Sequence, residues 1–367
     1  MADASVRFRL NHVRVPFRRP YVTAAGAADV REVLIVRLEN DSGVIGLGEA
    51  SLLPHETAGF EQLVRVTELA VRLFLSSGLD GLLKAQLGGS QIAAVAAVET
   101  AVRDAMARAE DKPLARALSN DALDHVEVNG LVNAADIDDA IEAAQELVAA
   151  GYGTVKLKVG IGHTAESEVV RIRAVREALT WETGLRLDAN GAWDEATAMT
   201  VLGGISDLDI EYIEQPVVRQ LKTMRILREG SNVPVAADED VGDRASAKRV
   251  IEAQAADVLV LKPIPLGGIT STLAIAEESR NAGLSDVVTT SIDTGIGTAM
   301  ALHIAAAIAS SYAAGLATAH LLESDLLTTP LQITHGRMAL PSRTGLGVEL
   351  NEAAVRQYTV REWVVDR

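Results

Sequence analysis

Eight short apolar runs, separated by helical patterns, constrain the fold of this chain more than any other feature. The segments between them, such as DDAIEAAQELVAAG and RASAKRVIEAQAA, show the apolar spacing of amphipathic helices. Strands that alternate with helices form parallel sheets, and about eight such units predict an α/β fold with a closed (β/α)8-type TIM barrel. An open, doubly wound sheet is the alternative, which the lack of a glycine-rich dinucleotide motif after the first run disfavours. The runs cover residues 126–132, 154–159, 185–190, 211–216, 233–239, 257–263, 285–291 and 313–321.

The residues before the first run have a different pattern. Residues 5–14 and 31–39 alternate polar and apolar side chains, and the NDSG sequence that follows is a turn signal. Residues 57–119 then show helical periodicity. A sheet followed by helices predicts an α+β domain. We therefore expect an N-terminal α+β domain over residues 1–125, completed by the C-terminal segment 323–367, and a barrel over residues 126–322.

Charge and composition exclude several classes of partner. The 34 Lys and Arg residues against 50 Asp and Glu residues leave a formal net charge of −16, which argues against nucleic acid or an anionic membrane as a partner. The chain has no Cys, which excludes disulfides, thiolate metal sites and a Cys nucleophile. Its first residues show no apolar signal segment, and polar residues interrupt its longest weakly polar stretch, residues 298–322. We expect a cytoplasmic protein with a small-molecule substrate.

Charged residues stand at the ends of five consecutive runs, where the active site of such a barrel lies. Any one of them alone has a simpler explanation, since an Asp at a strand end often caps a turn and a Lys is often a solvated surface residue. As a set they predict one site. They are, in chain order, Lys156 with Lys158, Asp188 with Asn190, Glu214, Asp238 with Glu239, and Lys262.

The chemistry of this set favours proton transfer beside a metal. Three carboxylates that converge at the barrel mouth would repel one another unless a cation lies among them. Oxygen ligands without Cys or His favour Mg²⁺ over zinc. A dication would lower the pKa of a neighbouring lysine, and it would acidify the α-proton of a bound carboxylate substrate. A lysine could then remove this proton to form an enediolate.

The motifs TVKLKVG, LRLDANGAWD, YIEQP, VAADED and VLKPIPLGG resemble, as an ordered set, the muconate-lactonizing subgroup of the enolase superfamily. The resemblance covers nearly the whole chain and implies an enolase-like modified barrel with an N-terminal capping domain. It implies Mg²⁺, with Mn²⁺ as a substitute, and a homo-oligomer. Its residue assignments are Asp188, Glu214 and Asp238 as metal ligands, Lys158 and Lys262 as acid/base lysines, Asn190 and Glu239 as supporting residues, and Lys156 as an electrostatic aid near the substrate carboxylate.

The same comparison disfavours the mandelate racemases, which use a His–Asp dyad from the sixth and seventh strands. Here those runs end in Lys262 and in Thr290-Ser291. The nearby His303 lies in an apolar helical segment and is interpreted as a packed core residue.

Within the subgroup, the segments VVTTSIDTGIGTAMALHIAAAI and AAGLATAHLLESDLLTTPLQITHGRMALP look most like those of o-succinylbenzoate synthases, which carry out a dehydration in menaquinone biosynthesis. Dipeptide epimerases have an Asp-x-Asp motif on the eighth strand, where this chain has Leu321-Leu322-Glu323. The alternatives are an N-succinylamino acid racemase or dipeptide epimerase, and then a muconate-type cycloisomerase. A barrel that only binds an anionic ligand is disfavoured because it would not need both lysines.

The segment VVTTSIDTGIGTAMALHIAAAI and two loops are the candidates for substrate contacts. Ser291, Thr294 and Gly295 could receive a succinyl carboxylate, although a helix N-terminus capped by Asp293 or Thr294 explains the same residues equally well. Residues 19–25, including Thr23, and residues 51–60, including Leu52, are expected over the barrel mouth, where they would set specificity.

Overall fold

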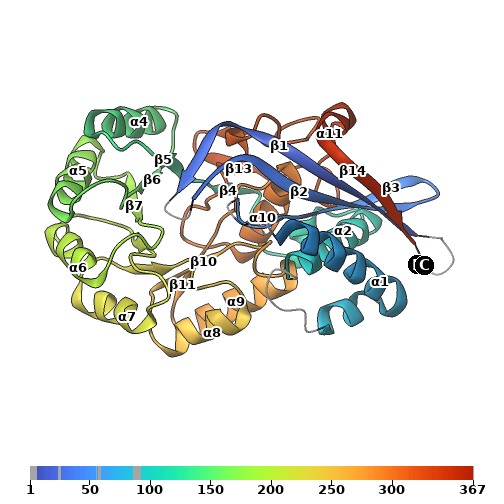
Figure 1. Ribbon diagram of the computed structural model, residues 1–367, viewed down its shortest axis with the longest axis horizontal. Helices are drawn as coiled ribbons and strands as arrows, with labels where there is room; N and C mark the ends of the chain where they lie inside the picture. The colour runs from blue at the N-terminus through green and yellow to red at the C-terminus, as the bar shows by residue number, and fades with distance from the viewer. Residues whose placement is uncertain (1–5, 24–25, 55, 57–58, 86–91, 367) are drawn as a thin grey trace.

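The computed structural model describes residues 6–23, 26–54, 56, 59–85 and 92–366. Figure 1 shows two units side by side. One contains the N-terminal strands (blue) together with the C-terminal strand (red), and the other contains a sheet surrounded by helices, coloured from green to orange. The chain therefore has an N-terminal capping unit and a barrel-like unit.

In the described part of the capping unit, four antiparallel strands form a sheet in the order β14-β1-β2-β3. The predicted strand at residues 31–39 lies within β2. Its residues from Val33 to Val36 are all fully buried, so neighbouring elements cover both faces of the sheet here. The strands span Arg7–Thr23 (β1), Gly26–Asn40 (β2), Gly43–Ala50 (β3) and Thr359–Val365 (β14).

Helix α2 packs directly on β3 because two glycines leave room for it. A Cβ atom on Gly46 would collide with the carbonyl oxygen of Ala101, and one on Gly48 would collide with that of Ala97. The small alanine side chains of the helix allow the same close approach. The helices of this unit span Phe60–Lys84 (α1), Ile92–Ala109 (α2), Leu114–Leu118 (α3) and Glu352–Tyr358 (α11).

In the described part of the barrel-like unit, seven parallel strands form one sheet in the order β5 to β11. A helix follows each strand, and α4 to α9 lie around the outside of the sheet (Figure 1). The strands span Gly130–Val132 (β5), Thr154–Lys158 (β6), Gly184–Asp188 (β7), Ile213–Glu214 (β8), Val235–Ala237 (β9), Val258–Leu261 (β10) and Ser285–Val288 (β11). The helices span Ile137–Ala149 (α4), Ala165–Ala178 (α5), Glu195–Gly204 (α6), Leu221–Gly230 (α7), Arg244–Glu252 (α8), Ile269–Asn281 (α9) and Gly295–Ile308 (α10).

The prediction of an eighth regular strand at residues 313–321 is wrong. Its first residues make only isolated parallel bridges, Ala314 to Val128 and Gly315 to Thr289, and residues Ala319–Leu321 form a short 3-10 helix (η3). These bridges still connect β11 with the segment before β5, so they join the two edges of the sheet. Gly315 is needed here because a Cβ atom would collide with the Thr289 side chain.

The first predicted run and the C-terminal segment each contribute strands to two different sheets. Residues 126–132 form β4 (His125–Glu127) and β5, and β4 belongs to a separate small sheet with β12 (Ile333–Thr334) and β13 (Arg337–Ala339). The last strand, β14, instead pairs with β1 in the capping unit. The C-terminal segment therefore contacts both units.

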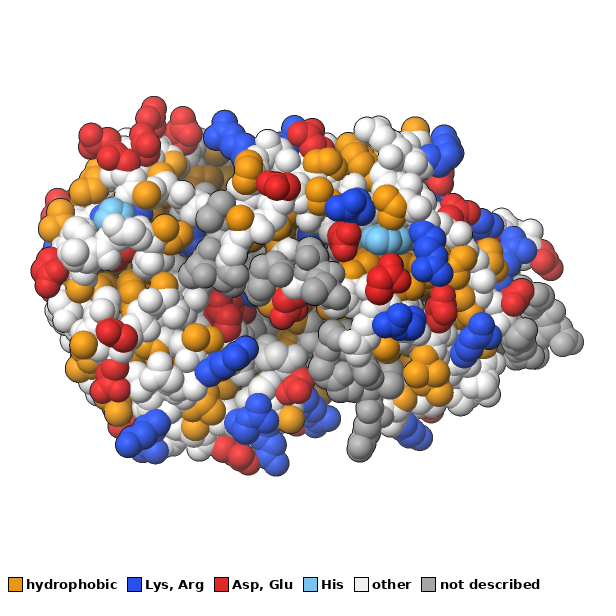
Figure 2. Space-filling model, in the orientation of Figure 1, with side chains coloured by type: hydrophobic (Ala, Val, Ile, Leu, Met, Phe, Trp, Pro, Cys, Tyr) orange, Lys and Arg blue, Asp and Glu red, His pale blue; other side chains and the backbone are white. Residues whose placement is uncertain are grey.

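The surface in Figure 2 shows acidic and basic side chains interspersed over the described residues of this face, without a broad basic patch among them. Of the described helices, none is both long enough and apolar enough to cross a lipid bilayer.

Asp286 on β11 carries a prediction about stability. Its carboxyl group is buried with one oxygen unpaired, and Arg280 lies 3.9 Å from the other oxygen. Burial raises the pKa of Asp286 to about 6, although Arg280 opposes the shift. The folded state thus holds this proton more tightly than the unfolded state, so the free energy of unfolding falls as pH rises from about 4 to about 6. The loss is up to about 3 kcal/mol.

Asp286→Asn should remove this contribution to the slope, because an amide does not ionise. Urea unfolding of both proteins at about pH 4 and about pH 7 measures it. The exposed residue Asp121 offers a control, since Asp121→Asn should leave the slope unchanged. An equal pH dependence in wild type and Asp286→Asn would contradict the prediction.

Candidate active site

A large cavity lies at the carboxyl ends of the parallel strands and has a volume of about 850 Å³. Side chains from the strands β5 to β8, β10 and β11 line it, as does Asp238 directly after β9. The capping unit adds Tyr21, Leu53, Pro54 and Glu56. The described parts of the two predicted specificity loops therefore do reach the barrel mouth. A pocket at this place is where a parallel barrel binds its ligand.

Strand geometry explains why the lysines and carboxylates meet. Lys156 and Lys158 are two residues apart on β6, so they share the face that points into the barrel, while Val155 and Leu157 are fully buried on the other face. In the pairing of neighbouring strands, Lys158 lies beside Asp188, and Asp188 lies beside Glu214.

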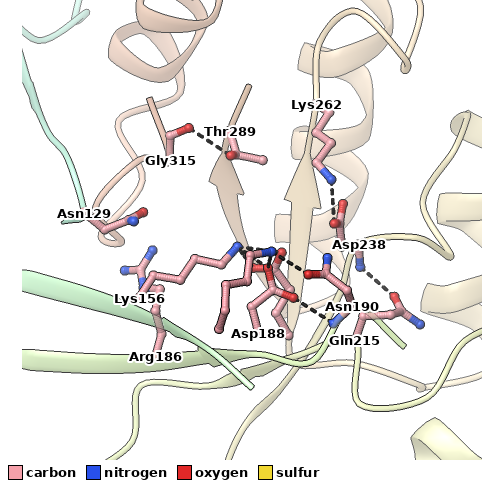
Figure 3. A network of polar contacts seen from close by, with 12 residues as sticks. Asn129, Lys156, Arg186, Asp188, Asn190, Gln215, Asp238, Lys262, Thr289 and Gly315 are labelled. Atoms are coloured by element: carbon pink, nitrogen blue, oxygen red, sulfur yellow. Dashed lines mark hydrogen bonds and ion pairs between the residues drawn. The ribbon is translucent and has the colours of Figure 1, made fainter. Parts of the chain in front are cut away.

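The ammonium groups lie between the carboxylates, as Figure 3 shows for several of them. Lys156 Nζ is 2.8 Å from both Asp188 Oδ2 and Glu214 Oε2. Lys158 Nζ is 2.7 Å from Asp188 Oδ2, and Lys262 Nζ is 2.5 Å from Asp238 Oδ2. The three carboxylates are nearly inaccessible to solvent, with 1%, 2% and 4% exposure for Asp188, Glu214 and Asp238. The structure thus brings together the two lysines and three carboxylates that the run ends predicted.

The charges of this cluster shift the pKa values of its members. Burial and the negative charge of Asp188 raise the pKa of Glu214 to about 8. Burial would lower the pKa of Lys262, but the carboxylates of Asp238, Glu239 and Glu214 outweigh it and hold the pKa above its usual value. This direction is opposite to the depression expected beside a dication, because the three neighbouring carboxylates favour the charged form of the lysine.

The donor set fits Mg²⁺ in its chemistry. Three oxygen-donating carboxylates come from the successive strands β7 and β8 and from the residue that follows β9. Their burial close to one another favours a cation among them. As their side chains stand, no three acidic or His groups in the described part of the chain converge closely enough to hold a metal. The lysines satisfy those oxygens instead, so binding of the ion would require the carboxylates to turn from the ammonium groups.

Asn190 and Glu239 lie beside this cluster, in keeping with a supporting role. Asn190 Oδ1 accepts a hydrogen bond of 2.5 Å from Lys158, and Asn190 Nδ2 donates one of 3.0 Å to Glu239. Burial, together with the charge of Asp238, raises the pKa of Glu239 to about 7. Asn190 therefore gives the Lys158 ammonium a second acceptor besides Asp188.

Sequence reasoning missed Gln215 and Arg186. Gln215 is fully buried with φ at 39°, and its Oε1 accepts 2.8 Å and 3.3 Å hydrogen bonds from the backbone N–H groups of Asp238 and Asp240. It therefore fixes the backbone that carries Asp238. Arg186 lines the cavity below Asp188, hydrogen-bonds Glu211 and stacks on the Tyr212 ring. The position of Arg186 two residues before Asp188 was the available signal, since both must share one face of β7.

The remaining predicted residues divide between the cavity and the interior. Ser291 lines the cavity, and its buried hydroxyl has no hydrogen-bond partner among the described residues. The structure does not bring the other three residues of that segment, or Leu52, into the cavity lining.

Thr294 and Asp293 are buried between the two units, where Glu49 accepts hydrogen bonds from the Thr294 hydroxyl and N–H groups. Gly295 packs against Leu327, and Leu52 precedes the lining residue Leu53. Thr23 ends β1, and its side chain lies outside the described part of the structure.

His303 is a core residue, as the sequence indicated. Its ring is fully buried in α10, where Nδ1 accepts a hydrogen bond from the Ala115 N–H group and Nε2 lies 3.1 Å from the Leu346 carbonyl oxygen. The pKa of His303 falls to about 4 because of burial. The ring therefore stays neutral and takes no part in the site.

Two family descriptions match this chain. Residues 139–354 match the family described as enolase C-terminal domain-like. Residues 5–118 match the N-terminal domain of the mandelate racemase / muconate lactonizing enzyme family. Together with the fold and the cluster of lysines and carboxylates, these matches define the class. The chain belongs to the enolase superfamily, whose shared chemistry is removal of a proton next to a carboxylate.

The relatives of this chain within the superfamily catalyse several different reactions, so they do not select one for it. The chain is 40% identical to o-succinylbenzoate synthase of Thermobifida fusca over 222 residues, which is 60% of this chain and 67% of that protein. It is 30% identical to muconate cycloisomerase 1 of Rhodococcus opacus over 357 residues, 94% of this chain and 95% of that one. The structure of an N-succinyl Arg/Lys racemase from Bacillus cereus superimposes with a TM-score of 0.87 at 25% identity, and covers 99% of each chain.

Proposed function

We propose that this protein is a Mg²⁺-dependent o-succinylbenzoate synthase, which removes a proton α to a carboxylate and then eliminates water. The observation that carries the proposal is the pair of lysines on β6 and after β10, with three carboxylates between them in one cavity. Mg²⁺ held by Asp188, Glu214 and Asp238 would supply charge that acidifies the α-proton.

The chain's own residues supply the proton transfers. Lys158 takes the α-proton as a general base, which leaves an enediolate, and then gives that proton to the departing hydroxyl group. The C–O bond breaks, water leaves, and the lysine returns to its starting state. Lys262 stays protonated and stabilises the enediolate by its charge. Asn190 holds the Lys158 ammonium in place through the 2.5 Å hydrogen bond.

One comparison favours the synthase over the cycloisomerase, and one feature of the cavity fits a substrate with two carboxylates. The 40% identity to the Thermobifida fusca synthase is well above the 30% identity to the cycloisomerase, although it covers less of the chain. The buried hydroxyl of Ser291 lines the cavity and has no hydrogen-bond partner among the described residues. It is suited to donate a hydrogen bond to a second carboxylate, which the substrates of both candidate reactions carry.

Racemisation of an N-succinylamino acid is the second candidate. Two lysines on strands separated by β7, β8 and β9 can face opposite sides of a substrate, as a racemase requires. The likeness over the full chain to the N-succinyl Arg/Lys racemase structure favours the same reading.

The test follows both reactions in one experiment. The protein with Mg²⁺ in D₂O is given the hydroxylated precursor of o-succinylbenzoate and, separately, single enantiomers of N-succinylamino acids. Proton NMR should show o-succinylbenzoate forming with Mg²⁺ and none forming after EDTA treatment. Efficient racemisation without dehydration would select the second candidate. If neither compound reacts or exchanges its α-proton, the proposed function is wrong.

A further inference from the structure

A buried arginine connects the capping unit with the barrel-like unit next to the cavity. Arg31 on β2 is only 1% exposed. Its Nη2 donates a 2.7 Å hydrogen bond to Ser51 Oγ, and its Nη1 donates to the Leu52 carbonyl oxygen. On the other side, its Nε donates a 2.9 Å hydrogen bond to the Ile292 carbonyl oxygen. One planar guanidinium therefore contacts two segments that lie far apart in the chain.

Both segments continue into the cavity wall. Ser51 and Leu52 come directly before Leu53 and Pro54, which line the cavity from the capping unit. Ile292 itself lines the cavity from the loop between β11 and α10. The position of either wall relative to the other thus depends on the length and shape of the Arg31 side chain.

The backbone of Ile292 shows that this contact holds a strained conformation. Its φ angle is 61°, in the left-handed region that a β-branched residue rarely adopts. Such a conformation persists only where the surroundings impose it, and it is common at functional sites. The hydrogen bond from Arg31 to the Ile292 carbonyl oxygen is part of that constraint.

Two carboxylates, Glu49 and Asp293, are buried beside Arg31, and they differ in what they bind. Glu49 accepts hydrogen bonds from the Thr294 N–H group at 3.0 Å and the Gly297 N–H group at 2.8 Å, so it binds the N-terminus of α10. Asp293 Oδ1 lies 3.6 Å from Arg31 Nη2 and makes no hydrogen bond within the described structure. Glu49 therefore holds the helix, while Arg31 holds the loop that forms the cavity wall.

We propose that Arg31 is a positioning residue that sets substrate affinity. It fixes the distance and orientation between the wall of the cavity formed by the capping unit (Leu53, Pro54) and the wall formed by the barrel-like unit (Ile292). It acts through Leu52 and Ile292 and does not touch the reacting atoms. The proposal rests on the proposed function for its kinetic and binding measurements, but not for its hydrogen-exchange measurement. A shift in the walls weakens binding of the whole substrate, so it raises KM with little effect on kcat.

Arg31→Lys tests this because it keeps the charge but loses the planar fork that serves three acceptors. We expect KM for the dehydration substrate, and Kd for o-succinylbenzoate measured by calorimetry with Mg²⁺, to rise about tenfold or more, with kcat within about threefold. Hydrogen exchange should speed up together in peptides containing Leu52 and Ile292. Glu49→Gln is the matched control, and we expect it to lower Tm while leaving KM within about twofold.

Several results would overturn the proposal. An unchanged Kd in folded Arg31→Lys would do so, and so would a fall in kcat at constant KM. If Arg31→Lys does not fold, Ser51→Ala, which removes one of the three contacts, must raise KM about threefold. An unchanged KM in Ser51→Ala then decides against it. If the wild type neither binds o-succinylbenzoate nor forms it, the proposed function fails. Coupled hydrogen exchange of the two walls in either variant then still decides the role of Arg31.

Discussion

Lys158→Ala should lose both dehydration and α-proton exchange, each by roughly 10²–10⁴-fold, because it removes the general base that we assign to the reaction. Asp188 and Asn190 hold the Nζ atom of Lys158 in place at 2.7 Å and 2.5 Å, so another side chain cannot easily take over its position. Lys262→Arg should behave differently. It keeps a cation near Asp238 but cannot act as a base near neutral pH, so a synthase should retain measurable dehydration.

Steady-state dehydration and exchange in D₂O, measured for both variants, distinguish the two candidate functions. Lys248, an exposed residue on α8, offers a control, and Lys248→Ala should match the wild type. A racemase would show another pattern, in which each lysine variant loses exchange for one enantiomer only. Full dehydration activity in Lys158→Ala would rule out our assignment of the base.

Asp188→Asn should reduce activity by at least about 10²-fold and remove its dependence on Mg²⁺, because a neutral amide is a poorer ligand for a hard dication. The same holds for Glu214→Gln and Asp238→Asn if the three side chains form one site. Their shared burial and their positions at the ends of successive strands motivate this expectation. Binding of Mn²⁺, followed by electron paramagnetic resonance, provides a measurement that does not depend on turnover.

The control for these variants is Asp207→Asn, a change in an exposed carboxylate that pairs with Arg173 on the outer surface. It should leave both Mn²⁺ binding and activity unchanged. Mn²⁺ affinity in Asp188→Asn equal to that of the wild type would remove Asp188 from the metal site. Such a result would also weaken the assignment of its neighbour Glu214.

The architecture was predictable where it depends on local periodicity. Apolar runs of six or seven residues between amphipathic helices correspond to strands β6, β7 and β10, because a buried parallel strand needs an apolar segment of about that length. The run at residues 313–321 misled because composition does not show whether a segment has a hydrogen-bonding partner along its whole length. There, Gly315 and its small neighbours follow β11 for one bridge and then leave the sheet.

The reactive cluster was predictable for a related reason. Parallel strands in a barrel bring their carboxyl ends to one mouth, so charged residues at the run ends must converge even though the nearest ones in different runs are 23 or more positions apart. No comparable rule predicts which residues of the loops after the strands contact the substrate. Ser291 reaches the cavity, whereas Thr294, three residues later, is held by Glu49. The direction of the chain after a strand depends on what packs against it.

The sequence alone thus determined the class of fold, the position of the site and the residue types that could carry its chemistry, because strand and helix periods are local properties. Only the tertiary structure decided which residues surround the substrate. Arg31 reads as an ordinary residue of an N-terminal strand, and its role depends on Ile292, which lies 261 positions away. Contacts of that separation are decided by how the two units pack, and packing energy is spread over many side chains that no single motif records.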